Sequence, residues 1–291
     1  MAITIAFANQ KGGVAKTLTT SCVARILTMN GYRVLCVDMD PQRNLSMTAG
    51  KGIAIPVDDT QTLNVIDVIE ERCPIQSAII HTCLGDLLRS STLLTQWNTP
   101  LSISPDEYEE VRDNHEKLIA LCDDRIRNQR RKQAKLYRAL KKVQDDYDFI
   151  LIDSNPSLTL VTLNCLYASD YIVVPALSEV TSIVAVSELI NTVQTILSYS
   201  YDRKIEILGI LMTRCEKRTS AYARYVDLYK SFSKKCNIKL FDSKIRKNAR
   251  AADCIDAFSN LIDYDKRGTA TQDYIKFVHE LLIEIKERRA S

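Results

Sequence analysis

The chain has 291 residues, of which 46% are hydrophobic and 26% charged, and its formal net charge is +3. This composition is typical of a globular protein, and the length allows one large α/β domain or two small ones, of which we expect one. The nine cysteines are scattered without a C-x-x-C pair, so we expect free thiols in a reducing compartment and no zinc or iron–sulfur site. We expect no leader peptide before the first strand, and no apolar run approaches the ~20 residues of a membrane span.

A glycine-rich segment follows the first expected strand. Residues 3–8 are apolar and β-branched and predict a buried strand, and residues 18–30 have the apolar spacing of a helix packed on a sheet. Between them, residues 9–17 read Asn-Gln-Lys-Gly-Gly-Val-Ala-Lys-Thr. A glycine-rich turn before a helix directs backbone N–H groups and the positive end of the helix dipole toward one point. The pattern predicts a phosphate-binding loop for a nucleoside di- or triphosphate.

Side-chain chemistry gives the polar residues of this loop distinct roles. Lys16 can place a positive charge on the β and γ phosphates, and the Thr17 hydroxyl can ligate Mg²⁺, which prefers oxygen. Lys11 is a second lysine at the entrance of the loop. For the loop taken alone, an ordinary glycine turn between strand and helix is the alternative interpretation.

Two further strands end in aspartate. Residues 33–42 form an apolar strand that delivers Asp38 and Asp40, and residues 147–157 contain a strand that ends at Asp153. A carboxylate in such a position can hold a water of the Mg²⁺ shell. A single aspartate after a strand is usually a cap or turn residue. Three strand-end sites in this order favour a nucleotide site instead.

The rest of the chain predicts regular alternation of strands and helices. Residues 43–62 are expected to be a loop, residues 63–69 a short helix, and residues 84–91 contain a strand. Later helices are expected at 158–168, 181–197, 220–236 and 271–288, with strands at 171–175, 205–213 and 238–245. This order predicts an α/β fold, a mostly parallel, doubly wound sheet of about seven strands with helices on both faces. The ligand should lie at the carboxyl ends of the strands, where Lys16, Asp40 and Asp153 converge.

A charged segment at residues 105–145 interrupts this alternation. It begins with Pro-Asp-Glu, a helix-start signal, and residues 125–135 are strongly basic. Two interpretations are open, a solvated helical face or an arm that faces nucleic acid. We treat it as a helical insertion in a single domain of residues 1–291.

These motifs together resemble those of the ParA/MinD ATPases. Residues 11–17 resemble the deviant Walker A motif KGGxGKT, residues 37–42 the second motif and residues 149–158 the Walker B motif of that family. Similarity continues through residues 162–166, 173–175, 208–214 and 245–248. It therefore covers nearly the whole chain, matches the short, Soj-like ParA branch best, and implies a P-loop NTPase-like fold.

The resemblance implies an ATP hydrolase that uses ATP and Mg²⁺. ATP–Mg²⁺ is expected to join two subunits, with Lys11 reaching the phosphates of the second subunit and Asp40 positioning the attacking water. Asp38, Asp153 and Thr17 are expected to serve the Mg²⁺ shell. The nucleotide-binding residues implied are Lys11, Gly12, Gly13, Val14, Ala15, Lys16, Thr17 and Leu18.

The resemblance also implies partners. The homodimer is expected to bind double-stranded DNA without sequence preference, in the cytoplasm at the nucleoid, and to release it after hydrolysis stimulated by a ParB-type protein. The cations expected to contact DNA are Lys217, Arg218, Arg224, Arg246, Lys247 and Arg250. No membrane partner is expected, because MinD-type relatives carry an amphipathic tail and residues 287–291 are too few for one.

Two residues depart from the family motif. Ala15 occupies a position that is glycine in the family, and if that position is left-handed, alanine costs about 1–2 kcal/mol there. Leu18 replaces a hydroxyl residue that reaches a phosphate, a loss of about 0.5–1.5 kcal/mol. We therefore expect weak nucleotide binding and slow turnover. The alternatives are a non-hydrolysing scaffold that senses nucleotide or binds DNA, and a MinD-like positioning ATPase.

Overall fold

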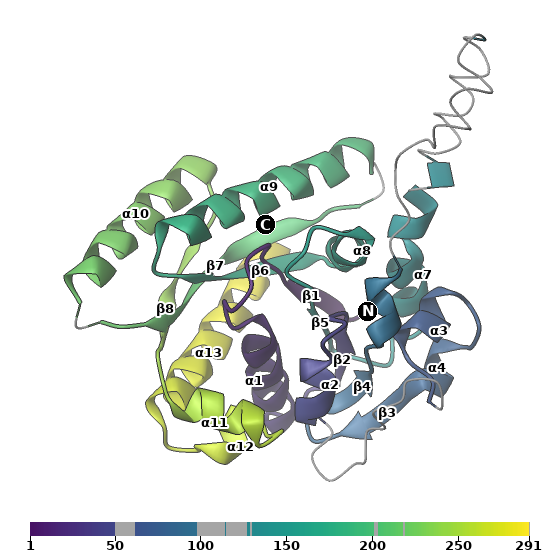
Figure 1. Cartoon of the computed structure of the whole chain (residues 1–291), viewed down its shortest axis with the longest axis horizontal. Helices are drawn as coiled ribbons and strands as arrows, with labels where there is room; N and C mark the ends of the chain where they lie inside the picture. Colours follow the sequence, from purple (N-terminus) through teal and green to yellow (C-terminus); the bar gives the residue numbers. More distant parts are fainter. Residues whose placement is uncertain are drawn as a thin grey trace.

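The computed structural model describes residues 1–49, 62–97, 114, 127–128, 130–200, 203–217 and 219–290. Its centre is an eight-stranded sheet with the strand order β3-β4-β2-β5-β1-β6-β7-β8 (Figure 1). The strands are β1 (Ile3–Phe7), β2 (Val34–Asp38), β3 (Ile79–Thr82), β4 (Gly85–Leu88), β5 (Phe149–Asp153), β6 (Tyr171–Leu177), β7 (Glu206–Cys215) and β8 (Leu240–Arg246). Every neighbouring pair is parallel except β3 with β4. The predicted α/β class is confirmed.

Helices cover both faces of the sheet (Figure 1). One face carries α1 (Lys16–Met29), α2 (Asn44–Ala49), α11 (Arg250–Asp256), α12 (Leu261–Tyr264) and α13 (Thr269–Ala290). The other carries α3 (Val65–Ile69), α7 (Lys135–Lys141), α8 (Leu160–Ala168), α9 (Val180–Tyr199) and α10 (Ser220–Cys236). The short helix α4 (Ile75–Ala78) follows α3, and the 3₁₀ helix η2 (Thr92–Thr95) follows β4.

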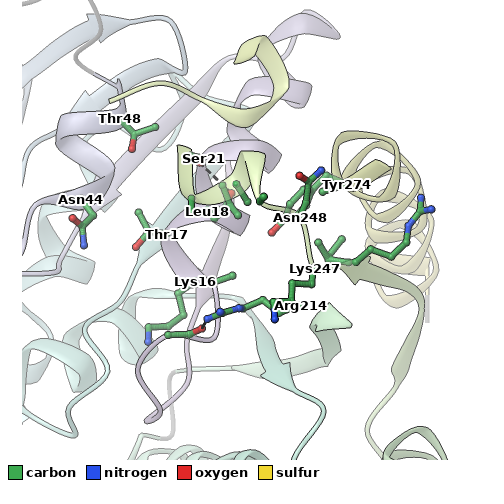
Figure 2. Close-up of a pocket in the computed structure, with 18 of the residues that line it drawn as sticks. Lys16, Thr17, Leu18, Ser21, Asn44, Thr48, Arg214, Lys247, Asn248 and Tyr274 are labelled. Carbon is green, nitrogen blue, oxygen red and sulfur yellow. Dashed lines mark hydrogen bonds between the residues drawn. The ribbon is translucent and has the colours of Figure 1, made fainter. Parts of the chain in front are cut away.

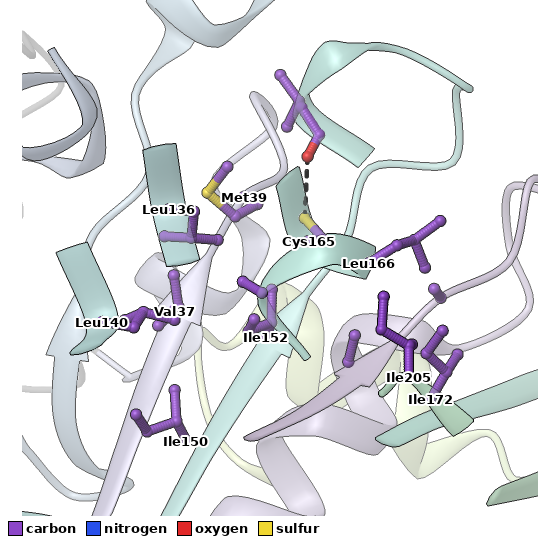
Figure 3. Packing of buried hydrophobic residues seen from close by; sticks show 14 of the residues in the cluster. Val37, Met39, Leu136, Leu140, Ile150, Ile152, Cys165, Leu166, Ile172 and Ile205 are labelled. Atoms are coloured by element: carbon purple, nitrogen blue, oxygen red, sulfur yellow. Dashed lines mark hydrogen bonds between the residues drawn. The ribbon is translucent and has the colours of Figure 1, made fainter. Parts of the chain in front are cut away.

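Strand β5 shows why the central strands are apolar at every position. Phe149 and Leu151 belong to the cluster under α1 and α13, whereas Ile150 and Ile152 belong to the cluster on the opposite face. Figure 3 shows Ile150 and Ile152 on the side of Leu136 and Cys165. Because successive side chains of a strand point to opposite faces, a strand covered on both faces must be apolar throughout. This requirement produces the continuous apolar run that predicted the strand.

The structure corrects two predictions of secondary structure. The sheet has eight strands instead of about seven, since β3 forms an antiparallel edge beside β4. Residues 44–49 form α2, so the loop predicted for 43–62 is wrong at its start, and 50–61 lie outside the described residues. An element of four to six residues contains fewer than two turns of a helix or only two or three strand repeats, so its periodicity is weak.

Most of the charged insertion lies outside the described residues. Of residues 105–145, the structure describes 114, 127–128 and 130–145, and the expected helix start at 105–107 is not among them. In the described part, Leu136, Ala139 and Leu140 of α7 are buried and pack in the same cluster as α8. The end of the insertion therefore belongs to the layer of helices on this face.

Helix α9 is more apolar than expected. Its segment Val180–Ser198 is long and apolar enough to cross a membrane by length and composition alone, contrary to the expectation that no run approaches this length. In the structure Val186, Leu189 and Val193 are buried in the core cluster beside the sheet. A core helix packed on a sheet can pass the same test, and this packing accounts for the apolar residues on the buried side of α9.

Candidate functional site

A cavity of about 520 Å³ lies at the carboxyl edge of the sheet. Its first wall is the glycine-rich loop and the start of α1, with Lys16, Thr17 and Leu18 (Figure 2). Its second wall comes from the end of the chain and comprises residues 245–249 after and at the end of β8, Ala251 and Ala252 of α11, and Tyr274 of α13. The sequence predicted the first wall at this edge of the sheet. It did not predict the second.

Strands β6 and β7 hold the glycine-rich loop in place. Asn9 Nδ2 donates to the carbonyl of Pro175 at 2.7 Å, and Asn9 Oδ1 accepts from the Lys11 N–H at 3.0 Å. The Thr213 hydroxyl donates to the carbonyl of Val14 at 3.0 Å. A Cβ at Gly12 or Gly13 would meet no heavy atom of the described residues within 4 Å. The loop is therefore fixed from behind and open on the side of the cavity.

Ala15 has the left-handed conformation that makes alanine costly. Its φ is 64° and its ψ is 35°, and it is the N-cap residue of α1. It makes no side-chain hydrogen bond to the helix, so within the described residues no side chain caps α1. The first N–H groups of α1 therefore remain available for an anionic ligand.

Lys16 is a buried cation, with 7% of its surface exposed. Its Nζ donates to the carbonyl of Lys11 at 3.1 Å. Burial lowers the pKa of Lys16, and the nearby carboxylates of Asp153 and Asp40 oppose that shift. An ammonium group has three donors, so Lys16 can bind phosphate oxygens in addition to the loop carbonyl.

Asp38 and Asp153 form a buried pair on adjacent strands. They are register partners in β2 and β5, and both are fully buried. Burial raises the pKa of Asp38 to about 6, although the Ser46 hydroxyl at 2.7 Å and the Ser46 N–H at 2.8 Å donate to it. Burial and the neighbouring Asp38 raise the pKa of Asp153 well above its ordinary value. Two carboxylates in this setting favour a bound cation or a bound proton.

The oxygen atoms at this point fit Mg²⁺. Asp153 Oδ2 is buried and has no hydrogen-bond partner in the part of the chain that the structure describes. The described residues contain no cluster of three His, Cys, Asp or Glu side chains that could hold a metal. Two carboxylates and the Thr17 hydroxyl are therefore the donors available. Such a sparse oxygen set suits Mg²⁺, which keeps several waters and binds substrate phosphates.

Asp40 and Lys11 occupy different places relative to the cavity. Asp40 lines it, and its Oδ1 accepts from the Gln42 N–H at 2.9 Å. Lys11 does not line it. Its ammonium forms an ion pair with Glu179 and a hydrogen bond to the Thr181 hydroxyl, at the start of α9. In this state Lys11 is satisfied within its own chain.

The cations predicted for DNA do not form one unpaired patch. Lys217 and Arg224 are exposed and have no ion pair among the described residues, while Arg218 lies outside those residues.

The other three cations form ion pairs. Arg246 binds Asp273 through two contacts of 2.7 Å, Lys247 pairs with Glu216 at 2.6 Å, and Arg250 pairs with Asp253 at 3.7 Å. Arg246 and Lys247 also line the cavity. A DNA role for these cations stays a prediction.

Several lining residues were missed by the sequence interpretation. They include Arg214, Ile245, Asn248, Ala249, Ala251, Ala252 and Tyr274. Arg214 lies near the end of β7, so the rule that ligands bind at the carboxyl ends of strands could have identified it. Tyr274 was assigned only to the core stripe of the last helix, and its hydroxyl contacts the Thr19 hydroxyl at 3.1 Å.

Residues 2–207 match the model of a family described as AAA domain. The chain belongs to this family. Within it, the chain is similar over its whole length to ParA/Soj proteins. It is 29% identical to the sporulation initiation inhibitor protein Soj of Bacillus subtilis (strain 168), over 95% of this chain and 97% of Soj. It is 28% identical to the chromosome partitioning protein ParA of Myxococcus xanthus (strain DK1622), over 96% of this chain and 87% of that protein.

A solved structure shows the same fold. The putative plasmid partition protein of Borrelia burgdorferi B31, crystallised bound to AMPPNP, has a TM-score of 0.73 and 21% identity. The comparison covers 98% of this chain and 100% of that chain. The family membership and the ParA/Soj resemblance inferred from the motifs are confirmed.

Replacing Ala15 by glycine should stabilise the ligand-free protein by about 0.5–1 kcal/mol. Relief of left-handed strain, about 1–2 kcal/mol, exceeds the stabilisation that glycine gives the unfolded chain, about 0.4–1 kcal/mol. Urea unfolding of both forms measures the difference.

Asn237→Gly is the matched control, since Asn237 is also left-handed, with φ 52°, and asparagine tolerates that conformation. Equal or lower stability of Ala15→Gly would reject the strain. Because the strain is present before nucleotide binds, ATP affinity should change only if the methyl group crowds the phosphates.

Stability without metal should fall as the pH rises. A carboxyl whose pKa is higher in the folded state binds its proton more tightly there, so its contribution is complete below the unfolded value and is lost as the pH rises through the folded value. Folding raises the pKa of Asp38 from 3.8 to about 6. Over this pH interval the free energy of unfolding should therefore fall by about 3 kcal/mol.

Asp153→Asn should reduce this loss, because it removes one buried charge. In EDTA at pH 7.5 the variant should be more stable than the unsubstituted protein by on the order of 1 kcal/mol. Urea unfolding between pH 4 and 7.5 gives the profile, and Asp146→Asn, an exposed aspartate before β5, is the control. An unchanged pH profile in Asp153→Asn would contradict the assignment.

Proposed function

We propose that this chain is a ParA-type partition ATPase that binds ATP and Mg²⁺ at the carboxyl edge of its sheet. The observation that carries the proposal is the convergence of the glycine-rich loop and buried Lys16 with the Asp38–Asp153 pair, which has one unpartnered oxygen. The names of the relatives, Soj and chromosome partitioning protein ParA, support it. So does the AMPPNP bound to the Borrelia protein of the same fold.

The two walls of the cavity suit the two ends of a nucleotide. The loop residues Gly12 and Gly13 and the amino end of α1 from Ala15 to Leu18 offer N–H groups and the Lys16 ammonium to the phosphates. The opposite wall is more apolar, with Ile245, Ala249 and Ala252 beside Tyr274, and suits the base. Thr17, Asp38 and Asp153 would hold Mg²⁺, which neutralises phosphate charge when bound. Asp40 at the cavity wall would orient the attacking water.

Dimerisation requires a change of partner at Lys11. To reach the phosphates of a second subunit, Lys11 must exchange Glu179 and Thr181 for those phosphates. Next to Glu179, Val180 and Val184 expose 57% and 52% of their surfaces on the first turns of α9. Exposed apolar side chains beside this lysine support a contact with a second copy of the chain.

DNA binding is assigned to the exposed cations near α10. Lys217 and Arg224 are exposed here, as are Lys234 and Lys235 in the last turn of α10. Lysine and arginine side chains bind the phosphate backbone without reading the bases. We further propose a ParB-type partner that stimulates hydrolysis, and a cytoplasmic location at the nucleoid.

A non-hydrolysing scaffold is the second candidate. The left-handed Ala15 and the loss of a hydroxyl at Leu18 favour it, because both weaken the phosphate site. Measuring ATP turnover with and without DNA separates the two. Turnover that DNA and a ParB-type protein raise supports the ATPase, whereas ATP binding without turnover supports the scaffold.

Lys16→Ala should abolish ATP–Mg²⁺ binding, and Asp40→Ala should leave it nearly unchanged while turnover falls. Lys16 supplies the buried cation of the ground state, whereas a residue that orients water acts mainly in the transition state. Calorimetry and phosphate release measure the two quantities. Lys141→Ala, an exposed lysine of α7, is the control. Unchanged affinity in Lys16→Ala would reject the phosphate loop, and loss of ATP binding in folded Asp40→Ala would reject its role with water.

The double variant Lys217→Glu/Arg224→Glu should weaken binding to unrelated DNA duplexes to the same extent. If each residue contacts one phosphate, the slope of log affinity against log salt should become shallower by about two. Fluorescence anisotropy with two unrelated duplexes at several salt concentrations provides the measurement. The control is Lys276→Glu on α13, which also reverses an exposed charge. Equal losses in the control, or a strong preference for one duplex, would contradict the assignment.

A further inference from the structure

Arg214 places a guanidinium over the phosphate loop. It is the penultimate residue of β7, and its backbone is left-handed, with φ 51°. Its side chain lines the cavity, and its Nη1 donates to the carbonyl of Gly13 at 3.3 Å. Figure 2 shows the side chain extending toward the loop beside Lys16. A left-handed conformation is unfavourable for arginine, so the surrounding strands must fix it at this position.

The other cations of the second wall are neutralised. Arg246 is bound by Asp273, and Lys247 by Glu216. In contrast, no carboxylate of the described residues lies within ion-pair distance of Arg214. A guanidinium has five N–H donors, and the contact with Gly13 uses one. Lys16 and Arg214 are therefore the lining cations that remain available to an anion in the described part of the cavity.

The free donors of Arg214 can be related to a missing hydroxyl at Leu18. It lines the same cavity and offers no hydroxyl where the family motif has one. We propose that Arg214 binds the phosphate chain of the nucleotide and supplies the hydrogen-bond donors that Leu18 lacks. This inference rests on the nucleotide site proposed above. Arginine suits the task because its planar donors match two phosphate oxygens at once.

Arg214→Gln should weaken ATP–Mg²⁺ and tripolyphosphate binding by about tenfold, since a charge-assisted hydrogen bond is lost. Arg214→Lys keeps the charge but not the paired donors, so its affinity should lie between the two. Calorimetry measures both ligands, and unfolding curves report the fold. Arg72→Gln is the control, because Arg72 is exposed and pairs with Asp67 outside the cavity. Wild-type affinity in Arg214→Gln overturns the proposal. Equal losses in the Lys and Gln variants would show that Arg214 only braces the loop, and would also overturn it.

Leu18→Thr tests the compensation directly. The restored hydroxyl should raise ATP affinity more in the Arg214→Gln background than in the natural sequence, because the two groups serve the same phosphates. Equal effects in both backgrounds would overturn the claim that Arg214 replaces this hydroxyl. Lys16→Ala separates the two proposals. If it loses ATP while Arg214→Gln binds normally, the inference about Arg214 alone fails. If both bind normally, the nucleotide site fails as well.

Discussion

The burial of two carboxylates beside one lysine is the constraint on which this site depends. Asp38 and Asp153 are register partners at the carboxyl ends of β2 and β5, and water reaches neither. Their mutual repulsion and desolvation disfavour the ionised pair, and Lys16 is the cation that the chain supplies. A divalent cation with a polyanion would complete this charge set. The edge of the sheet is thus organised for a ligand at the expense of stability without one.

The loop that presents Lys16 is held by distant strands as much as by its own glycines. Hydrogen bonds from Asn9 to Pro175 and from Thr213 to Val14 fix it from two sides. Such support explains how Ala15 keeps a left-handed conformation that alanine alone would avoid. The same strand edge brings Arg214 over the loop. The effect of Ala15 and Leu18 on the loop therefore depends on the residues that surround it.

Ion pairs decide which cations face a ligand and which face their own chain. Asp273 binds Arg246 and Glu216 binds Lys247. These two cations, which the sequence predicted to contact DNA, therefore stabilise the second wall of the cavity. Glu179 likewise holds Lys11 at α9. An arginine bound by a carboxylate through two contacts has few donors left for DNA. Arg214, Lys217 and Arg224 differ in having no such partner among the described residues.

The parallel α/β sheet, the phosphate loop and a ligand edge with Lys16, Asp40 and Asp153 could all be predicted from the sequence. These features follow from local patterns, since apolar runs, helical spacing and a glycine-rich turn each span a few residues. The edge strand β3, helix α2, the second wall of the cavity and the pairing of the cations became visible only in the folded structure. Lys11 and Glu179 are 168 residues apart, and Arg246 and Asp273 are 27 apart. No local period encodes such contacts, because they form only when the strands and helices have packed.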